Sequence, residues 1–200
     1  MSLVRVPTQK RSIEKKERII QKGFELMCEN GYFNTNTNDI AKYADVSTGI
    51  IYQYFNDKKD IFIEGVKNYS DNIMFPILDI LDTHKFKMDN LENLLNKLLD
   101  IFIKKHTLSK KAHEEIISLA HLDDEIADII HDKEMITTKK IVDILESNGI
   151  RSENLTEKVH IVIGLVENYC HEIVYHKHES LRYDVMKKEV IKVICGLLNN

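Results

Sequence analysis

The peptide VSTGIIYQYFNDKKD occupies residues 46–60, and its pattern is that of a short helix between two turns. Ser47 favours a helix start, because a serine hydroxyl accepts hydrogen bonds from the free N–H groups of a first turn. Ile50, Ile51 and Phe55 then give the helix one apolar face. We therefore expect a helix that packs on one side and leaves polar residues on the other.

A second short helix is expected immediately upstream, with Asn36 as its capping residue. Asp39 follows three residues later, which is the spacing of a capping box. Ala41 and Ala44 are small enough for another helix to cross closely. Two capped helices joined by about four residues form a helix-turn-helix. Its second helix is free to enter a DNA major groove with the N-terminal residues leading.

Residues 13–63 resemble the N-terminal domain of the tetracycline-repressor (TetR) family of transcriptional regulators. The matching pieces, in the family's order and spacing, are Gly31-Tyr32, Asp39-Ile40-Ala41, Val46-Ser47-Thr48-Gly49, Tyr52-Gln53-Tyr54-Phe55 and Lys58-Lys59-Asp60. The segment covers about a quarter of the chain. The resemblance implies a homodimeric DNA-binding regulator whose helical body binds an effector.

The sequence departs from the family pattern at three positions. Asp45 stands where the family usually has glycine, and Thr37 stands where an aliphatic residue is usual. We expect these two to loosen local packing slightly. Gln53 stands where histidine is frequent, which bears on the DNA sequence that is recognised and not on whether DNA is bound.

The candidate DNA contacts lie in and beside the two short helices. Thr48 can reach a base edge or a phosphate, Gly49 lets the backbone approach the groove, and Gln53 can pair with adenine through two hydrogen bonds. The other candidates are phosphate contacts, which fix the register of a protein on DNA: Thr35, Asn36, Tyr52, Tyr54 and Lys58. The alternative for the two tyrosines is a place in the core.

Composition and charge fit this interpretation. The 200 residues are 43% hydrophobic and 30% charged, with two prolines and seven glycines, which favours an all-α protein. The net charge of −4 is unevenly distributed, because the first 22 residues hold seven basic and two acidic side chains. A basic N-terminal end on an acidic body is typical of a DNA-binding protein.

We expect a cytoplasmic protein that does not enter a membrane. No apolar run approaches the roughly 18 residues of a membrane span, and residues 1–22 lack the apolar region of a signal peptide. Three well-separated cysteines, without CxxC spacing, indicate buried thiols and neither a disulfide framework nor a zinc knuckle.

We predict about nine helices in two domains. Residues 1–56 are the helix-turn-helix domain, with residues 1–11 as a disordered arm, and residues 57–200 form an effector-binding and dimerisation domain. Asp57, with Asp60 three residues on, predicts the start of a fourth helix, and Pro76 predicts a kink or break near its end. The later helices are expected at about 89–105, 109–121, 123–147, 154–178 and 184–198.

The last two helices are the most apolar. Residues 161–166 are apolar all round, so this segment must be buried on more than one side. In a small body, this favours packing against the same helices of a second copy. The resemblance implies the same homodimer, through residues 154–178 and 184–198.

An effector site in the body is what the resemblance implies. The candidates are residues on otherwise apolar helices: Phe102, His106, Glu167, Asn168 and His171. A polar layer in the dimer interface is an alternative for Glu167, Asn168 and His171. We predict no metal site and no cofactor, because the spacings of His171 from His176 and His178 do not match an i,i+4 ligand pair.

Two other functional classes compete with this interpretation. An enzyme is disfavoured, because the chain contains no nucleophile elbow, phosphate loop or HExxH sequence. The alternative that remains is a helix-turn-helix regulator controlled by a protein partner or a metal ion, with no organic ligand.

Overall fold

The computed structural model describes residues 7–70, 90–108 and 110–199. Nine helices and no strand occur in these residues, so the prediction of an all-α chain is confirmed. The chain divides into two compact units. The first consists of Met1–Tyr69 and Lys111–Ile129, and the second of Ser70–Lys110 and Ile130–Asn200.

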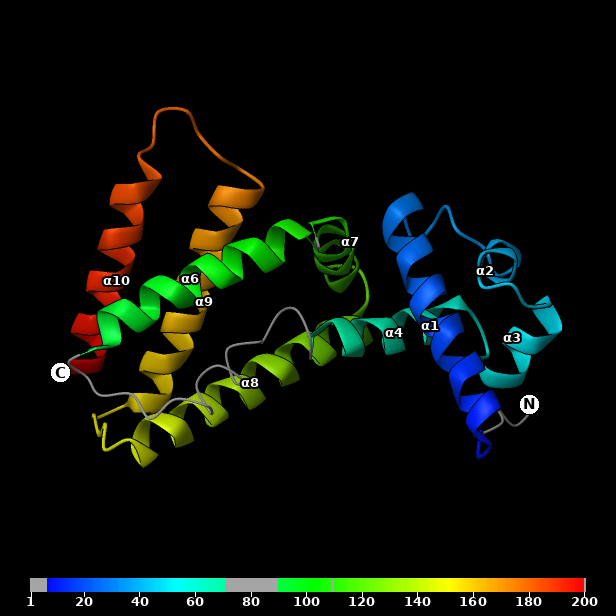
Figure 1. The fold of residues 1–200 in the computed structure, drawn as a ribbon, viewed down its shortest axis with the longest axis horizontal. Helices are drawn as coiled ribbons and strands as arrows, with labels where there is room; N and C mark the ends of the chain where they lie inside the picture. The colour runs from blue at the N-terminus through cyan, green and yellow to red at the C-terminus, as the bar shows by residue number, and fades with distance from the viewer. Residues whose placement is uncertain (1–6, 71–89, 109, 200) are drawn as a thin grey trace. The chain divides into compact units, whose positions relative to one another are not determined.

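The first unit begins with α1 (Lys10–Asn30), followed by the short helices α2 (Thr37–Tyr43) and α3 (Thr48–Tyr54). Next comes α4 (Lys58–Tyr69), and the unit also contains most of α7 (Lys110–Ala120). Helix α1 packs against α4 and α2, and α2 packs against α3 (Figure 1). This is the predicted three-helix arrangement with the helix-turn-helix resting on α1.

Helices α1 and α4 cross so closely that two positions have no room for a side chain. A Cβ atom on Gly23 would lie 2.7 Å from Ile61 and 3.0 Å from Ile40, and one on Gly65 would lie 2.4 Å from Phe24. Since real Cβ atoms do not approach other atoms this closely, glycine sets the distance between the helices.

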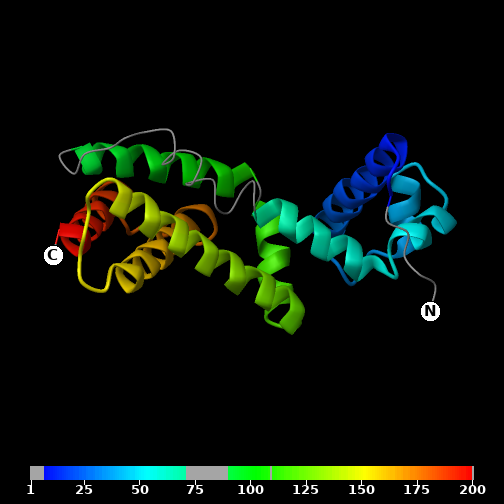
Figure 2. The ribbon, with the colours of Figure 1, turned by 90° about the horizontal axis from the view of Figure 1, so that it is seen from below.

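The second unit holds α6 (Leu91–Leu108), the larger part of α8 (Asp124–Ser147), α9 (Leu155–Val174) and α10 (Tyr183–Asn199). Helix α6 packs against α9 and α10, which also pack on each other; Figure 2 gives a second view. The expected ranges agree with these bounds to within a few residues, except that α9 ends at Val174 and not near residue 178.

Apolar side chains from four helices form the core of the second unit. Its most deeply buried members include Leu99 on α6, Tyr169 and Cys170 on α9, and Ile194 on α10. Leu145 joins from α8. The segment predicted to be apolar all round, 161–166, packs only partly against this core, and Ile161 is 56% exposed.

Several predictions concern residues outside the described ranges. These are the kink at Pro76 with the far end of the fourth helix, and the first six residues of the expected disordered arm. Helix α1 begins at Lys10, so residues 10 and 11 of that arm are helical. Among the helices described, none has the length and apolar character needed to cross a membrane.

Candidate nucleic-acid interface

The turn between α2 and α3 is closed by backbone hydrogen bonds. The N–H of Ala44 donates to Ile40 O at 2.9 Å, and the N–H of Val46 donates to Ala41 O at 3.0 Å. Asp45 lies between them with φ 52°, in the left-handed region that favours glycine. This geometry explains why glycine suits the position and why aspartate, which tolerates the conformation better than most residues, replaces it here.

The predicted capping box of α2 is present. Asn36 Oδ1 accepts from the N–H groups of Asn38 and Asp39, and Asp39 accepts from the N–H of Asn36. The side-chain oxygen of Asn36 therefore holds the helix start. Because these first-turn N–H groups are already paired, the side-chain amide N–H groups of Asn36 are the donors that this cap can offer to a phosphate.

The start of α3 is held differently from the prediction. Ser47 occupies the N-cap position but makes no side-chain capping hydrogen bond. The hydroxyl of Thr48 donates to Asn38 Oδ1 at 2.9 Å, which ties the first turn of α3 to the first turn of α2. Thr48 is thus fixed in place, and its hydroxyl oxygen remains an acceptor.

Helix α3 has one buried and one exposed face. Ile51 and Tyr54 are buried, whereas Tyr52 is 51% exposed and Gln53 and Gly49 are exposed. A Cβ on Gly49 would meet no atom within 4 Å, so packing inside this chain does not require glycine there. The exposed face of α3 thus carries three of the predicted DNA-contacting residues.

Three other predicted DNA contacts are used inside the first unit. Tyr54 is only 6% exposed, so its ring lies in the core, as the alternative prediction for this residue had it. Thr35 is buried and its hydroxyl donates to Gly31 O at 3.0 Å. Lys58 Nζ donates to Tyr32 O at 2.6 Å and Thr35 O at 2.7 Å, and burial lowers the pKa of its amine.

Lys58 therefore joins the loop before α2 to the start of α4. Its Nζ also lies 4.3 Å from the centroid of the Tyr32 ring, a cation–π distance. Sequence reasoning assigned this lysine to phosphate and did not foresee the clamp, since nothing local shows which carbonyl groups lie near. Contact of Lys58, Thr35 or Tyr54 with DNA remains a prediction.

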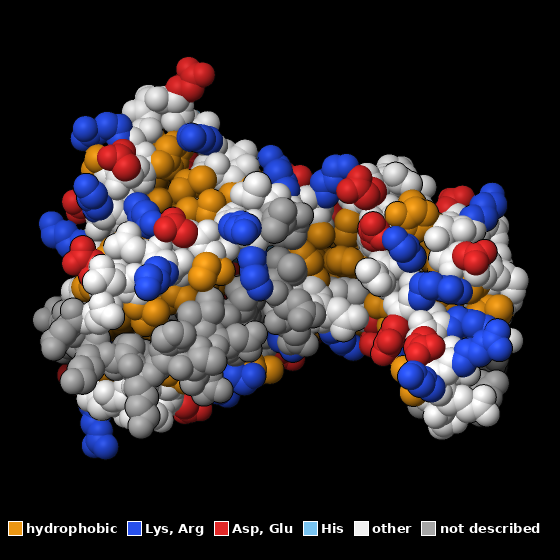
Figure 3. All heavy atoms as spheres, viewed as in Figure 1, with side chains coloured by type: hydrophobic (Ala, Val, Ile, Leu, Met, Phe, Trp, Pro, Cys, Tyr) orange, Lys and Arg blue, Asp and Glu red, His pale blue; other side chains and the backbone are white. Residues whose placement is uncertain are grey.

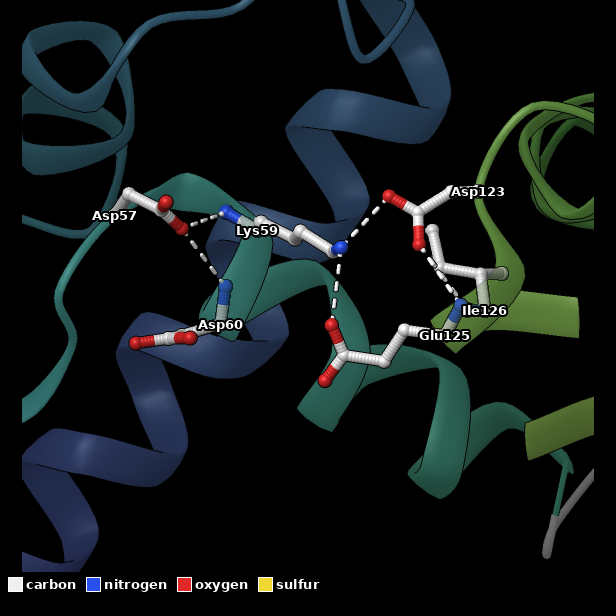
Figure 4. A network of polar contacts seen from close by, with 6 residues as sticks. All are labelled: Asp57, Lys59, Asp60, Asp123, Glu125 and Ile126. Atoms are coloured by element: carbon white, nitrogen blue, oxygen red, sulfur yellow. Dashed lines mark hydrogen bonds and ion pairs between the residues drawn. The ribbon is translucent and has the colours of Figure 1, made fainter. Parts of the chain in front are cut away.

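A polar network at the start of α4 extends to α8 (Figure 4). Asp57 Oδ1 accepts from the N–H groups of Lys59 and Asp60, so the predicted cap is confirmed. In a capping box the Asp60 carboxylate would accept from the N–H of Asp57. It accepts instead from the backbone N–H and the side-chain amide of Asn56.

Lys59 is the centre of this network. Its Nζ lies 2.7 Å from the Asp123 carboxylate and 3.0 Å from that of Glu125. The hydrogen bond from Lys59 lowers the pKa of Asp123, and the hydrogen bonds to the two carboxylates raise the pKa of Lys59. Within the first unit, the start of α4 is thereby bound to the start of α8.

Helix α7 is tied to the same unit by two further contacts. The Glu115 carboxylate accepts from the N–H of Tyr32 at 2.5 Å, and Lys111 pairs with Glu29. The sequence separations of these pairs are large, so no local pattern pointed to them. The compact unit that carries the helix-turn-helix thus includes α7 and the first residues of α8.

The candidate effector residues lie in the second unit. The ring of His106 is 6.3 Å from that of Phe102 and 6.0 Å from that of His171. The structure therefore brings three of the five candidates together. Asn168 is exposed, and burial together with the charge of Glu134 raises the pKa of Glu167 to about 7.

The helix-turn-helix is similar to that of a known family of regulatory proteins. A family model described as "Bacterial regulatory proteins, tetR family" matches residues 19–64, which include α2, α3 and the turn between them. The helix-turn-helix part of the chain is therefore that of the tetR family. The resemblance of residues 13–63 predicted a transcriptional regulator of this family, and that recognition is confirmed.

Two curated relatives show how far the likeness extends. The HTH-type transcriptional regulator HbdR of Aromatoleum sp. (strain CIB) is 47% identical over 58 residues, or 29% of this chain and 25% of HbdR. The uncharacterized HTH-type transcriptional regulator YvdT of Bacillus subtilis (strain 168) is 25% identical over 189 residues, or 90% of this chain and 93% of YvdT.

Solved structures share the whole fold. A crystal structure described as a TetR-family transcriptional regulator from Mesorhizobium loti superposes with a TM-score of 0.69 at 19% identity, covering 96% of each chain. At this identity the likeness shows the fold alone. It confirms an N-terminal helix-turn-helix followed by a C-terminal helical domain of the TetR type.

Proposed function

We propose that this TetR-family chain is a cytoplasmic, homodimeric repressor that binds a near-palindromic operator and is released by an effector. The observation that carries the proposal is the exposed face of α3. Gly49, Tyr52 and Gln53 lie together on that face while Ile51 and Tyr54 anchor the other. A helix anchored in this way can enter a major groove without disturbing its own core.

The division of labour on this surface follows from chemistry. Gln53 carries a donor and an acceptor on one side chain, which suits a bidentate contact with adenine. Gly49 leaves space beside the first turn of α3, and Tyr52 presents a hydroxyl for phosphate. At α2, the side-chain amide N–H groups of Asn36 suit a phosphate oxygen.

Dimerisation is supported by the apolar surface of α9 and α10. Ile161 is 56% exposed and Val193 is 49% exposed, and several of their neighbours on the two helices are only partly buried. On the face seen in Figure 3, hydrophobic side chains gather between these helices. In a two-fold dimer the same surface of both subunits is buried, so each exposed apolar residue contributes once from each copy.

The repressor role and the effector response are each supported by the description of one similar protein. IcaR of Staphylococcus aureus (strain Newman), 36% identical over 62 residues, is described as a negative transcriptional regulator. A regulator from Saccharomonospora viridis, with a TM-score of 0.67 at 18% identity, was solved in complex with choline. We infer that Phe102, His106 and His171, with Glu167 and Asn168 on the preceding turn of α9, form the effector region here.

The route from effector to DNA follows the polar network of the first unit. Helix α8 begins in the first unit and continues into the second. Within the first unit, Lys59 binds the start of α8 to the start of α4, and Lys58 binds α4 to the loop before α2. A change in α8 would therefore act on the elements that position α3, to the extent that the effector distinguishes the two states.

Operator selection from random duplex DNA tests the proposal. We expect the purified protein to enrich an inverted repeat and its affinity to fall steeply with salt, because phosphate contacts release counterions. Gln53→Ala should weaken binding to the selected operator by roughly 5- to 150-fold, equivalent to about 1–3 kcal/mol. Gln21→Ala, an exposed glutamine on α1, is the matched control.

The effector part is tested separately. Asn168→Ala should alter release by an effector while leaving operator affinity unchanged. Enrichment of no motif, with weak binding to all sequences, would refute the repressor. Equal losses in Gln53→Ala and Gln21→Ala would refute the assignment of base recognition to α3.

A further inference from the structure

His106 is held in one orientation by its own helix. It lies near the end of α6 and is only 1% exposed. Its Nδ1 lies 2.9 Å from the carbonyl oxygen of Phe102, one turn earlier. Because a carbonyl oxygen can only accept, the hydrogen of the neutral ring is on Nδ1, and Nε2 carries the lone pair.

His171 brings a second imidazole to the same place from α9. The two ring centroids are 6.0 Å apart with an interplanar angle of 68°, and a ring nitrogen of one lies within 4.8 Å of a ring nitrogen of the other. The ring of Tyr175 lies 4.9 Å from that of His171, so an aromatic side chain supports the second imidazole.

Two imidazoles on separate helices, one of them oriented by a backbone carbonyl, are an arrangement that histidine ligands adopt around metals.

The distances allow a shared ion after a small movement. Bonds of about 2.0–2.1 Å at a tetrahedral angle place two ligand nitrogens roughly 3.4 Å apart. The rings would therefore close by up to about 1.4 Å. His171 is only half-buried and can supply this movement by turning about its side-chain bonds.

We propose that the second unit binds a first-row transition-metal ion through Nε2 of His106 and a ring nitrogen of His171. Water or further donors fill the remaining positions. Imidazole ligands suit Zn²⁺, Co²⁺, Ni²⁺ and Cu²⁺ and disfavour Mg²⁺ and Ca²⁺, which prefer oxygen. The hydrogen bond from His106 Nδ1 to Phe102 O acts as the support that orients the first ligand.

The sequence did not predict this site, because histidine spacing along one helix was the criterion. His106 and His171 lie on α6 and α9, and only the packing of these helices brings them together. The metal binding does not depend on operator recognition. Only the further step, in which the ion acts as the effector, rests on the proposed function.

Direct titration of the full chain, produced without a polyhistidine tag, tests the site. Co²⁺ is followed by its visible absorption, and Zn²⁺ by competition against bound Co²⁺. We expect micromolar or tighter binding, and at least a 100-fold loss in His106→Gln and in His171→Gln. His131→Gln on α8 and His160→Gln on α9 replace exposed histidines and should change affinity less than 2-fold. Binding that is absent, or unchanged in both site variants, would overturn the proposal.

A second variant separates metal ligation from folding. His171→Cys retains a donor atom, so bound Co²⁺ should acquire the near-ultraviolet charge-transfer absorption of a thiolate ligand. A residue that only packs cannot produce this signal, and its absence in a variant that melts cooperatively would refute ligation by this residue. Titration of Zn²⁺ into the complex with selected operator then measures the effect on DNA. Metal binding with unchanged operator affinity would retain the site and refute the ion as effector.

Discussion

The two compact units differ in how closely their helices pack and in where they expose apolar side chains. In the first unit, α1 and α4 meet where Gly23 and Gly65 leave no room for a Cβ. In the second, Gly164 on α9 would place a Cβ with no atom within 4 Å, and Ile161 and Val193 expose about half of their surface. The first unit also exposes single apolar side chains, Phe33 and Leu122 most of all, but those exposed at Ile161 and Val193 lie on the two helices predicted to form the dimer.

This difference matches the tasks proposed for the units. A DNA-reading helix must be held in one orientation, since a small displacement separates side chains from the base edges. The clamp by Lys58 and the network of Lys59 provide that constraint with charged hydrogen bonds. A unit that dimerises and responds to an effector needs unfilled surface instead.

The largest effect is expected from a charge on the open surface of α9. Ile161→Lys should weaken dimerisation by about 3–6 kcal/mol, because two-fold symmetry removes two buried isoleucines at about 1.5–3 kcal/mol each. This corresponds to a dissociation constant raised by roughly 10² to 10⁴. Sedimentation velocity over a concentration series measures it.

A matched control is available in the same unit. Ile136→Lys on α8 replaces an isoleucine that is 45% exposed and lies outside α9 and α10. It should leave the dimer intact. If both variants weakened the dimer equally, the exposed apolar surface of α9 would not be the dimer interface.

The closed core is tested at Gly65. Gly65→Ala places a Cβ 2.4 Å from the ring of Phe24, so α1 and α4 must separate. We expect the free energy of unfolding to fall by about 1–3 kcal/mol. Gly164→Ala is the comparison, and it should gain about 0.5–1 kcal/mol from the reduced entropy of the unfolded chain.

Urea unfolding of both glycine variants is best measured in the monomeric Ile161→Lys background, so that dimer contacts do not contribute. A loss in Gly164→Ala as large as that in Gly65→Ala would contradict the distinction between a closed and an open unit.

The clamp by Lys58 is expected to have a similar or slightly smaller effect. Lys58→Met keeps the length of the side chain but leaves Tyr32 O and Thr35 O without their donor. Hydrogen bonds of this charged kind contribute about 1.5–3 kcal/mol, part of which is offset because the amine no longer has to be buried. We expect a net loss of about 1–2 kcal/mol.

Thermal unfolding monitored by circular dichroism measures this loss. Lys67→Met, which removes an exposed lysine paired with Glu64 on the same helix, should be nearly neutral. If Lys58→Met retained full stability and lost only DNA affinity, the original phosphate-contact prediction would be the better description.

Sequence reasoning succeeded where the determining interactions are local. The cap by Asn36 and Asp39 involves residues three apart, and Ile51 was placed on the apolar face of its helix from helical spacing. These features fixed the helix-turn-helix, and together with the family resemblance they gave the fold.

It failed where the partner is distant in the chain. The carbonyl groups that receive Lys58, the carboxylates that receive Lys59, and the second imidazole beside His106 all come from other elements. A sequence shows that a lysine or histidine is present but not which acceptor the fold brings to it. Tyr54 illustrates the same point, since the sequence left open whether this ring contacts phosphate or lies in the core, and the fold buries it.

A smaller effect is expected from Glu167 in the second unit. Its pKa is raised from 4.5 to about 7, chiefly by burial and further by Glu134. The folded chain therefore holds a proton that the unfolded chain releases between pH 4.5 and 7, so stability falls as pH rises through this window. Glu167→Gln removes the dependence.

We expect Glu167→Gln to be more stable than the parent by on the order of 1 kcal/mol at pH 8 and equal to it near pH 4. This gain in stability is smaller than the full pKa shift of Glu167 would give, because the side chain retains contact with solvent. Urea unfolding at the two pH values measures the difference. A gain of equal size at both would assign it to packing and not to ionisation.

The smallest effect is expected at the turn between α2 and α3. Asp45 has φ 52° and Asn154, before α9, has φ 57°; among the residues that the structure describes, these are the two non-glycine residues with positive φ, one in each unit. Asp45→Gly relieves the conformational cost but increases the freedom of the unfolded chain, and we expect a net gain of about 0.5 kcal/mol or less. Asp45→Ala should lose about 1 kcal/mol, since alanine lacks the tolerance of aspartate for this region.

The comparison between these two variants is more informative than either alone. The hydrogen bond that the turn receives from Arg18 goes to the backbone oxygen of Asp45, so it survives both substitutions. The same pair at Asn154 provides the matched test in the second unit. Glycine and alanine variants could have equal stability at Asp45 but different stability at Asn154. The turn between α2 and α3 would then adapt to alanine without a cost in stability. This part of the first unit would be less rigid than its core indicates.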